Sequence, residues 1–266
     1  MNRLKVAPRL KSGKLRNQVI LNIAKRLYQS PVALGIWCYV VSHLCTWIFD
    51  LKGIDALMAY LLPLFVAYLK RHVIFYEIHL IIDVFKRNLG YEDTYNSVDN
   101  DLYLGCIPFD ADDSDILIKK LGITSILSIY DKKMIQMNTI MGIPVQPNEW
   151  EIFDINHLII EMPEFCHTMS PKRLHCGADF INKYLSTGQD RIYVHCRNGN
   201  RLSALVIMAY FIKYKNMKSQ QAYDSLVASR RRPEFAGRTC PEVQSLLKFE
   251  ETFRTNSNND SNISKE

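Results

Sequence analysis

Several features are missing from this 266-residue sequence, and each absence argues against a class of protein. The seven cysteines are odd in number and include no CxxC pair, which argues against a disulfide framework or a zinc site. This cysteine usage indicates reduced thiols in a cytosolic-type compartment. No internal repeat is visible, and we expect neither a metal nor a cofactor. The chain is 48% hydrophobic and 23% charged, which is typical of a folded protein.

Acidic residues are absent from residues 1–29, although this segment carries eight lysines and arginines. The formal net charge of the whole chain is +6, so all the remaining residues together carry −2. A basic segment attached to a nearly neutral body indicates a surface of anionic lipid as its partner rather than nucleic acid. The alternative is a disordered basic tail without a dedicated partner.

Charged residues are also absent from residues 32–49, a run that would be about 27 Å long as a helix, close to the thickness of a hydrocarbon core. A second apolar run, residues 56–69, is shorter and contains Pro63, which would kink a helix. Basic residues precede the first run and follow the second, which places both ends on the cytoplasmic side. We therefore expect residues 30–70 to form a membrane hairpin, with the domain that follows on the cytosolic side. The alternative is a helical subdomain packed on that domain.

A third apolar stretch, residues 73–85, differs from the first two because it carries Glu77, His79 and Asp83. Three titratable side chains within such a stretch argue against a membrane crossing. We interpret residues 71–90 as an interfacial or buried helix that links the hairpin to the folded domain.

Residues 91–255 have the pattern of one α/β domain. Strands are expected at residues 101–109, 123–131, 157–162 and 191–196. Helices are expected at residues 113–121, 171–185, 203–214, 219–229 and 241–253, the last with Thr239, Pro241 and Glu242 as a capping-box start. This alternation predicts a central, mostly parallel sheet flanked by helices. The polar residues 256–266 are expected to be a disordered tail.

The segment HCRNGNRLSA, residues 195–204, joins an apolar strand to an apolar helix. A loop that turns into a helix N-terminus points several backbone N–H groups at one spot, where they bind a phosphate dianion. The same field favours the thiolate of Cys196, which would then be an in-line nucleophile beneath the phosphate. Gly199 permits the loop conformation, and Ser203 is placed to donate to the sulfur.

With these motifs in place, residues 101–253 resemble the dual-specificity branch of the cysteine-dependent phosphatases. The resemblance rests on the segments DLYLGCIPF, ITSILSIYD, YVHC, SALVIMAYF and QQAYDSLVASRRRP. Within that branch the chain is most similar to the lipid-directed members typified by the mitochondrial phosphatidylglycerophosphate phosphatase. The resemblance implies a cysteine-phosphatase fold and hydrolysis through a phosphocysteine intermediate on Cys196.

The resemblance also implies roles for the residues around the nucleophile. His195 would orient the loop. The residues that would bind phosphate form one continuous run after the nucleophile: Arg197, Asn198, Gly199, Asn200 and Arg201.

One position departs from the family's pattern. The family places an arginine six residues after the cysteine, where this chain has Leu202. Losing a bidentate arginine contact would cost about 3–6 kcal/mol, or a rate loss on the order of 10²–10⁴. Arg201 would replace that arginine only if the loop were tightened by one residue, and Arg197 is the second candidate.

The general acid is unusual too, because the family uses an aspartate about thirty residues before the cysteine. Glu164 stands 32 residues before Cys196 and is our choice for this role. Glu161 and His167 are alternatives, and a surface carboxylate without function is the competing interpretation of Glu164.

Two hypotheses from different classes follow. In the first, the chain is a membrane-anchored phosphatase that acts on a phospholipid headgroup, either phosphatidylglycerophosphate or a phosphoinositide, or on a phosphoprotein. The basic residues 230–238 would then rim the pocket, or else form a solvated turn. In the second, which Leu202 favours, the chain is a pseudophosphatase that binds phosphate or lipid, or acts as a scaffold, without turnover.

Overall fold

The computed structural model describes residues 71–91, 93–137, 139, 142–163, 166, 168–229 and 240–263, together with single positions between residues 36 and 61. The chain divides into two units, residues 1–79 with 138–142 and residues 80–137 with 143–266. The sheet lies in the second unit. The predicted basic segment lies outside the described residues, and of the predicted hairpin only single positions are described.

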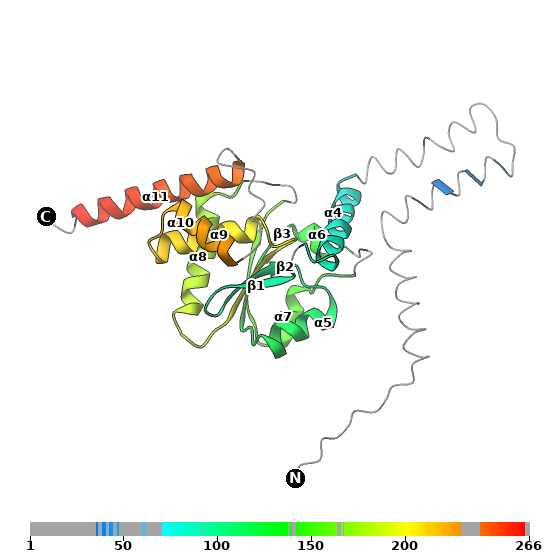
Figure 1. Cartoon of the computed structure of the whole chain (residues 1–266), viewed down its shortest axis with the longest axis horizontal. Coiled ribbons are helices and arrows are strands. Elements are labelled where there is room, and N and C mark those ends of the chain that lie inside the picture. Colours follow the sequence, from blue (N-terminus) through cyan, green and yellow to red (C-terminus); the bar gives the residue numbers. More distant parts are fainter. Residues whose placement is uncertain are drawn as a thin grey trace, which may run out of the picture. The chain divides into compact units, whose positions relative to one another are not determined.

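A five-stranded mixed sheet forms the centre of the second unit (Figure 1). Its strands are β1 (Tyr95–Asp99), β2 (Leu102–Cys106), β3 (Ser125–Tyr130), β4 (Asn156–Glu161) and β5 (Ile192–Cys196), and they lie in the order β1, β2, β5, β3, β4. Only the β1–β2 pair is antiparallel. The predicted α/β fold with a mostly parallel sheet is therefore confirmed, whereas β1 was not predicted.

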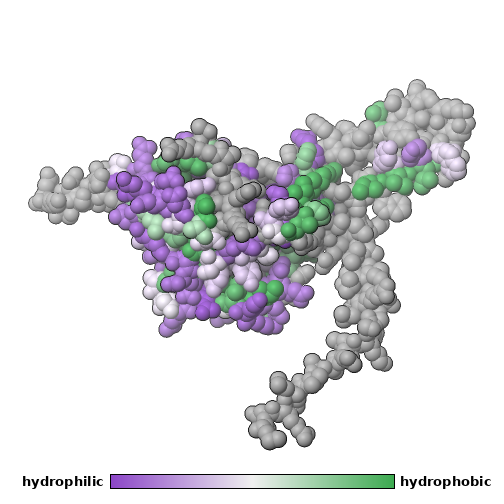
Figure 2. Space-filling view, viewed as in Figure 1, coloured by the Kyte–Doolittle hydropathy of each residue, from purple (hydrophilic) through white to green (hydrophobic). Residues whose placement is uncertain are grey.

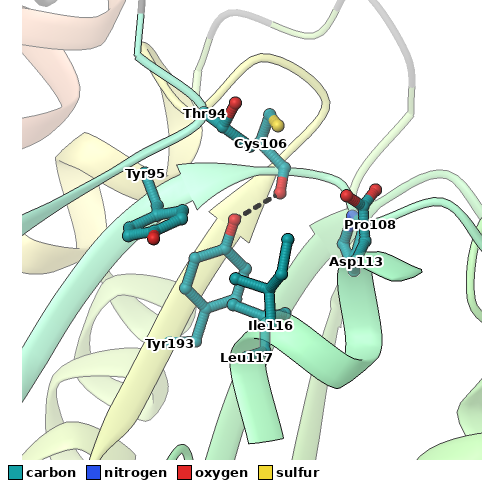
Figure 3. A pocket seen from close by; sticks show the side chains of 8 residues that line it. All are labelled: Thr94, Tyr95, Cys106, Pro108, Asp113, Ile116, Leu117 and Tyr193. Carbon is teal, nitrogen blue, oxygen red and sulfur yellow. Dashed lines mark hydrogen bonds between the residues drawn. The ribbon is translucent and has the colours of Figure 1, made fainter. Parts of the chain in front are cut away.

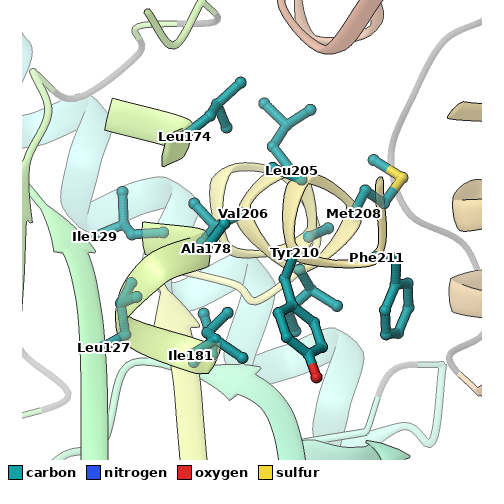
Figure 4. Close-up of a cluster of buried hydrophobic side chains, with 14 of the residues drawn as sticks. Leu127, Ile129, Leu174, Ala178, Ile181, Leu205, Val206, Met208, Tyr210 and Phe211 are labelled. Carbon is teal, nitrogen blue, oxygen red and sulfur yellow. The ribbon is translucent and has the colours of Figure 1, made fainter. Parts of the chain in front are cut away.

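The larger core lies between this sheet and two helices, α8 (Pro171–Leu185) and α9 (Leu202–Tyr214). Figure 4 shows Leu127 and Ile129 of β3 facing Ala178 and Ile181 of α8, with the side chains of α9 beside them. Alternate residues of a strand point to one face of the sheet, so Leu127 and Ile129 of β3 both point into the larger core. A Cβ on Gly177 would lie 2.5 Å from Val206 Cγ1, so this glycine lets α8 and α9 approach closely.

The opposite face of the sheet is covered by shorter elements and a second core. These elements are α5 (Asp110–Asp115), the π-helical η1 (Ile116–Lys120) and α7 (Pro147–Ile152), with α6 (Lys132–Ile135) after β3. Trp150 of α7 and Leu117 of η1 are buried there against Ile126 and Tyr193 of the strands. The helix predicted at 113–121 is thus two elements, and α6 and α7 were not predicted.

Two further helices, α10 (Ser219–Ser229) and α11 (Pro241–Ile263), pack on the α8–α9 layer. The predicted bounds of α8 and α10 agree with the structure. The predicted end of α11 at residue 253 is wrong, because the helix continues to Ile263 through most of the segment expected to be a disordered tail. Extending an existing helix needs no new nucleus, which physically favours this continuation over a break.

Helix α4 (Arg71–Asn88) precedes the sheet, where the sequence predicted an interfacial or buried helix. Its burial pattern is unusual, because Glu77 and Asp83 are buried whereas Phe75, Ile82 and Phe85 are exposed. Among the described residues, no helix has both the length and the apolar character needed to cross a membrane.

Candidate active site

The loop between β5 and α9 carries the predicted nucleophile. Cys196 is the last residue of β5 and is buried, and α9 begins six residues later at Leu202. Gly199 in the middle of the loop has φ = +76°, a conformation that favours glycine. The backbone N–H of Ile107 donates to the Arg197 carbonyl at 3.2 Å, which ties the loop to the end of β2. The loop is therefore short, fixed at both ends and directed at a helix N-terminus.

Polar side chains surround the Cys196 sulfur. Ser203 Oγ lies 3.1 Å from Cys196 Sγ, and the thiol donates to Asn198 Oδ1 at 3.8 Å. The same Asn198 oxygen accepts from the Asn200 backbone N–H at 3.1 Å, so Asn198 braces the loop from inside. Cys196, Ser203, Asn198 and Asn200 are all buried, and the structure brings these four predicted site residues together.

Arg201 is directed at a carboxylate on α11. Its Nε donates to Glu242 Oε1 at 3.1 Å, and its Nη2 contacts the same oxygen. The Glu242 side chain is only 4% exposed, so this ion pair is largely removed from water. Glu242, predicted as part of a capping box with Thr239, is thus the partner of Arg201, and Thr239 lies outside the described residues.

Leu202 occupies the position where the family pattern has arginine. It is the first residue of α9, is partly buried, and packs against the larger core. Ser203, the seventh residue after Cys196, contacts the sulfur. The loop is therefore not tightened by one residue, which is the change that would bring Arg201 to the position of Leu202.

Arg197 is held by α4. Its Nε donates to Asp83 Oδ2 at 3.0 Å, and the two side chains are 16% and 6% exposed. Burial raises the pKa of Asp83, and the neighbouring Arg197, Arg87 and Lys86 oppose that rise. The phosphate loop thus has a partner on a helix upstream of the sheet, a contact that the sequence did not predict. The signal for it in the sequence was the presence of two acids, Glu77 and Asp83, within an apolar helix.

His195 lies on the opposite face of the sheet from the nucleophile, in a hydrogen-bonded chain. Ser128 Oγ lies 2.7 Å from His195 Nε2 and 2.8 Å from His157 Nε2. Burial, together with the proximity of His157, lowers the pKa of His195 to about 3, and a backbone hydrogen bond at Cys196 opposes this. Burial lowers the pKa of His157 to about 4. The hydrogen bonds between Ser128 and these two neutral histidines fix the end of β5, where Cys196 lies. The participation of Ser128 and His157 was not predicted.

Of the three candidates for the general acid, only Glu161 lies among the described residues. It ends β4, is exposed, and pairs with Lys132 Nζ at 3.2 Å. Burial and the charge of Glu161 raise the pKa of nearby Tyr130 to about 12. Glu164 and His167 lie outside the described residues, as does the basic segment 230–238. The assignment of the acid therefore stays a prediction.

A small pocket lies at the end of β2, and none of the predicted site residues is among those that line it (Figure 3). The Tyr193 hydroxyl donates to the Cys106 carbonyl at 2.6 Å, and Figure 3 shows the Cys106 sulfur pointing away from the Tyr193 ring. Cys106 and Cys196 are direct partners in the β2–β5 register, so both cysteines end neighbouring strands. Within the described part of the chain, no group of three or more His, Cys, Asp or Glu side chains is arranged to hold a metal ion.

The sequence was compared with known protein families and curated proteins. The model of the dual-specificity phosphatase catalytic domain matches residues 102–252. A phosphatidylglycerophosphate phosphatase of Arabidopsis thaliana is 26% identical over 131 residues, which cover 49% of this chain and 36% of the relative. A phosphatidylglycerophosphatase and protein-tyrosine phosphatase of Rattus norvegicus is 26% identical over 163 residues, which cover 59% of this chain and 79% of the relative. The match thus spans about a third of the plant relative and most of the rat one.

The fold was also compared with solved structures. The crystal structure of PTPMT1 in complex with PI(5)P superposes with a TM-score of 0.53 at 19% sequence identity. The superposition covers 62% of this chain and 99% of that one. At this identity the likeness concerns the fold, and it confirms the predicted α/β architecture with a mostly parallel sheet flanked by helices.

Proposed function

The chain belongs to the dual-specificity phosphatase family, and we propose that it is a membrane-anchored phosphatase that removes phosphate from a phospholipid headgroup. The observation that carries this proposal is the geometry at Cys196. A buried strand-end thiol lies 3.1 Å from the Ser203 hydroxyl, beneath a short loop that opens onto a helix N-terminus. That arrangement binds a phosphate dianion and places a thiolate in line with its leaving oxygen.

The first chemical step would form a bond between Cys196 Sγ and phosphorus. The bond from phosphorus to the leaving oxygen breaks at the same time, and that oxygen takes a proton from a general acid, for which Glu164 remains the candidate. Backbone N–H groups of the loop and of the α9 N-terminus stabilise the charge on the phosphoryl oxygens. The products are the dephosphorylated alcohol and phosphocysteine.

The second step would release the phosphate. Water attacks phosphorus and gives up one proton to the carboxylate that acted as the acid in the first step. The sulfur–phosphorus bond breaks with its electron pair returning to Cys196 Sγ as thiolate, and inorganic phosphate leaves with the water oxygen. Ser203 Oγ is placed to donate a hydrogen bond to the departing sulfur, which stabilises the thiolate and lowers the cost of this step.

The lipid substrate and the membrane location rest on separate arguments. The plant and rat relatives both carry names that include activity on phosphatidylglycerophosphate. In the predicted hairpin, the seven described positions are helical and exposed: Ile36, Tyr39, Val40, His43, Leu44, Trp47 and Leu61. Exposed apolar side chains on a helix support contact with lipid. A phosphoinositide or a phosphoprotein substrate remains an alternative for the same site.

A second candidate function, a phosphate-binding module without turnover, is favoured by Leu202, which departs from the family's pattern, and by the ion pair of the neighbouring Arg201. Leu202 cannot donate to phosphate, and the Arg201 guanidinium is engaged by buried Glu242. A loop without the planar arginine clamp keeps its amides for binding but loses transition-state stabilisation.

The test uses the full chain in detergent micelles. Hydrolysis of an aryl phosphate is measured first, with Cys196→Ser as the blank, and then release of phosphate from phosphatidylglycerophosphate, a phosphoinositide and a phosphopeptide. In parallel, alkylation by iodoacetate near neutral pH is followed at each cysteine by mass spectrometry. We expect turnover that the blank lacks, lipid preferred to peptide, and rapid alkylation of Cys196 that phosphate or vanadate prevents.

The outcomes separate the two candidates. Protected, rapid alkylation of Cys196 without turnover of any substrate establishes the binding module and rejects the enzyme. Alkylation of Cys196 no faster than that of Cys106 or Cys166 rejects the phosphate loop itself. Preference for the phosphopeptide rejects the lipid substrate while leaving the phosphatase intact.

A further inference from the structure

Helix α4 has an inverted distribution of side chains. Five large apolar side chains at helical spacing are exposed along one side: Phe75, Ile78, Ile82, Phe85 and Leu89, the last just beyond the helix. Glu77 and Asp83, the acids of this helix, are buried on the other side. A water-facing helix normally shows the reverse pattern. Figure 2 shows the hydrophobic patch in green over α4.

The exposed fractions of these side chains are large. Phe85 is 63% exposed and Leu89 is 56% exposed. Single exposed apolar residues are common, but a continuous stripe marks a contact surface. Because both acids point inward, no acidic side chain of α4 is among its exposed residues.

Basic side chains accompany this stripe. Lys86 and Arg87 lie in the last turn of α4. Basic residues beside an apolar face are typical of helices that lie on anionic membranes.

The inner side of α4 fixes the helix to the phosphate loop. Asp83, on the side opposite to Phe85, accepts from Arg197 Nε at 3.0 Å, and Arg197 follows the nucleophile directly. Any surface that contacts the outer side of α4 therefore lies about one helix diameter, about 10–12 Å, from the ion pair between Asp83 and Arg197.

We propose that the outer face of α4, formed by Ile82, Phe85 and Leu89, rests on an anionic lipid bilayer and presents the phosphate loop to headgroups. The proposal rests on the proposed lipid substrate and adds a defined surface to it. A bilayer fits better than a protein partner, because the chain just upstream of α4 contains the uncharged residues 32–49 and the apolar residues 56–69. A helix that follows such a segment starts at the membrane surface.

The first experiment detects the contact without using activity. The photoreactive residue p-benzoylphenylalanine replaces Phe85 in the full chain, which is then reconstituted in vesicles of phosphatidylcholine with phosphatidylglycerol and irradiated. Ile152 on α7 is the matched control position, because it is 77% exposed and apolar but lies on another element. We expect lipid adducts from position 85 and none from position 152.

The second experiment measures the consequence for catalysis. Phe85→Glu and Ile152→Glu are compared on a phospholipid in vesicles and on a soluble aryl phosphate. Removing one apolar contact and adding a charge at the membrane surface is expected to lower lipid hydrolysis by Phe85→Glu on the order of tenfold. Aryl phosphate hydrolysis by that variant should stay unchanged, and Ile152→Glu should behave as the wild type on both substrates.

Each outcome decides one question. No lipid adduct at position 85, equal adducts at both positions, or an adduct joining two protein chains overturns the bilayer contact, whatever the activity. A lipid adduct at position 85 together with an inactive wild-type chain upholds the contact and overturns the proposed phosphatase. Equal losses on lipid and aryl phosphate for Phe85→Glu show damage to the loop and overturn the headgroup-presenting role.

Discussion

Helices α4 and α11 lie far apart in the sequence, yet each supplies a buried carboxylate to the phosphate loop. Asp83 of α4 binds Arg197, and Glu242 of α11 binds Arg201. Their outer sides differ, because α4 exposes large apolar side chains whereas the exposed residues of α11 are mostly polar, such as Gln244, Lys248 and Glu251. The inner sides thus make the same kind of ion pair with the loop, and the difference between the outer sides is what the proposed bilayer contact of α4 would require.

This comparison also bears on the missing arginine. Both arginines of the loop have acidic partners, and the position six residues after Cys196 holds Leu202. The charge of a bound phosphate would then be met mainly by loop amides and by the start of α9. Retention of Arg197 and Arg201 therefore does not restore the family's clamp in this arrangement.

The largest expected effect comes from breaking the two ion pairs. Asp83→Ala or Glu242→Ala leaves a largely buried guanidinium without its carboxylate, which is expected to cost about 3–5 kcal/mol of unfolding free energy. Urea unfolding of the full chain in detergent, followed by tryptophan fluorescence, measures the loss. Trp150 is buried in the second core and reports on the sheet unit.

Two controls make this test specific. Asp115→Ala removes an exposed partner of Lys119 and should change stability by less than about 1 kcal/mol. Asp83→Asn keeps an oxygen for Arg197 Nε and should lose less than Asp83→Ala. If only one of the two alanine variants is destabilised, the two ion pairs do not contribute equally to stability. The variant that stays stable then identifies the ion pair that contributes little.

A second prediction concerns Leu202. Leu202→Arg should raise kcat/KM for an aryl phosphate by about tenfold or more, since a planar guanidinium can bind two phosphate oxygens at once. Leu202 is only partly buried, so the packing cost is modest. Leu202→Lys is the matched control, because it adds the charge without the planar fork and should gain less.

The competing arrangement predicts the opposite pattern. If the loop tightens when substrate binds and Arg201 becomes the clamp, Arg201→Ala would abolish turnover and Leu202→Arg would not help. Initial rates of the two variants at several substrate concentrations separate these cases. The 3.1 Å contact between Cys196 and Ser203 and the engagement of Arg201 by Glu242 favour the first outcome.

Much of the sheet unit could be predicted because its signals are local. Apolar runs of strand length, helical periodicity and the HCRNGNRLSA segment predicted four of the five strands and the helices around the loop. β1 was missed because YNSVD is short, polar and only half-buried, so it lacks the apolar alternation that marks a strand. It becomes a strand by pairing with β2, which is a tertiary effect.

The supporting contacts of the site were harder to predict because they join distant residues. Asp83 and Arg197 are separated by 114 positions, and Ser128 and His195 by 67. A sequence shows the residue types but not which of several acids will meet an arginine. The buried acid in an apolar helix was visible, yet its partner depends on where α4 packs.

The last prediction tests whether the hydrogen-bonded histidines support the loop. Burial lowers the pKa of His157 to about 4, below its unfolded value of about 6.5, so the folded state binds this proton less readily than the unfolded state. The stabilisation from neutral His157 is therefore complete above pH 6.5 and is lost as the pH falls toward 4. Each pH unit within that window costs about 1.4 kcal/mol for one proton.

His157→Gln should remove this dependence, so the unfolding free energy of the variant falls less steeply between pH 6 and about 4.5 than that of the wild type. Ser128→Ala is the control, since it keeps the buried imidazole and should keep the steep dependence. If the unfolding free energies of wild type and His157→Gln change equally with pH, His157 is protonated equally in the folded and unfolded states. The hydrogen-bonded histidines would then not be a buried neutral support for Cys196.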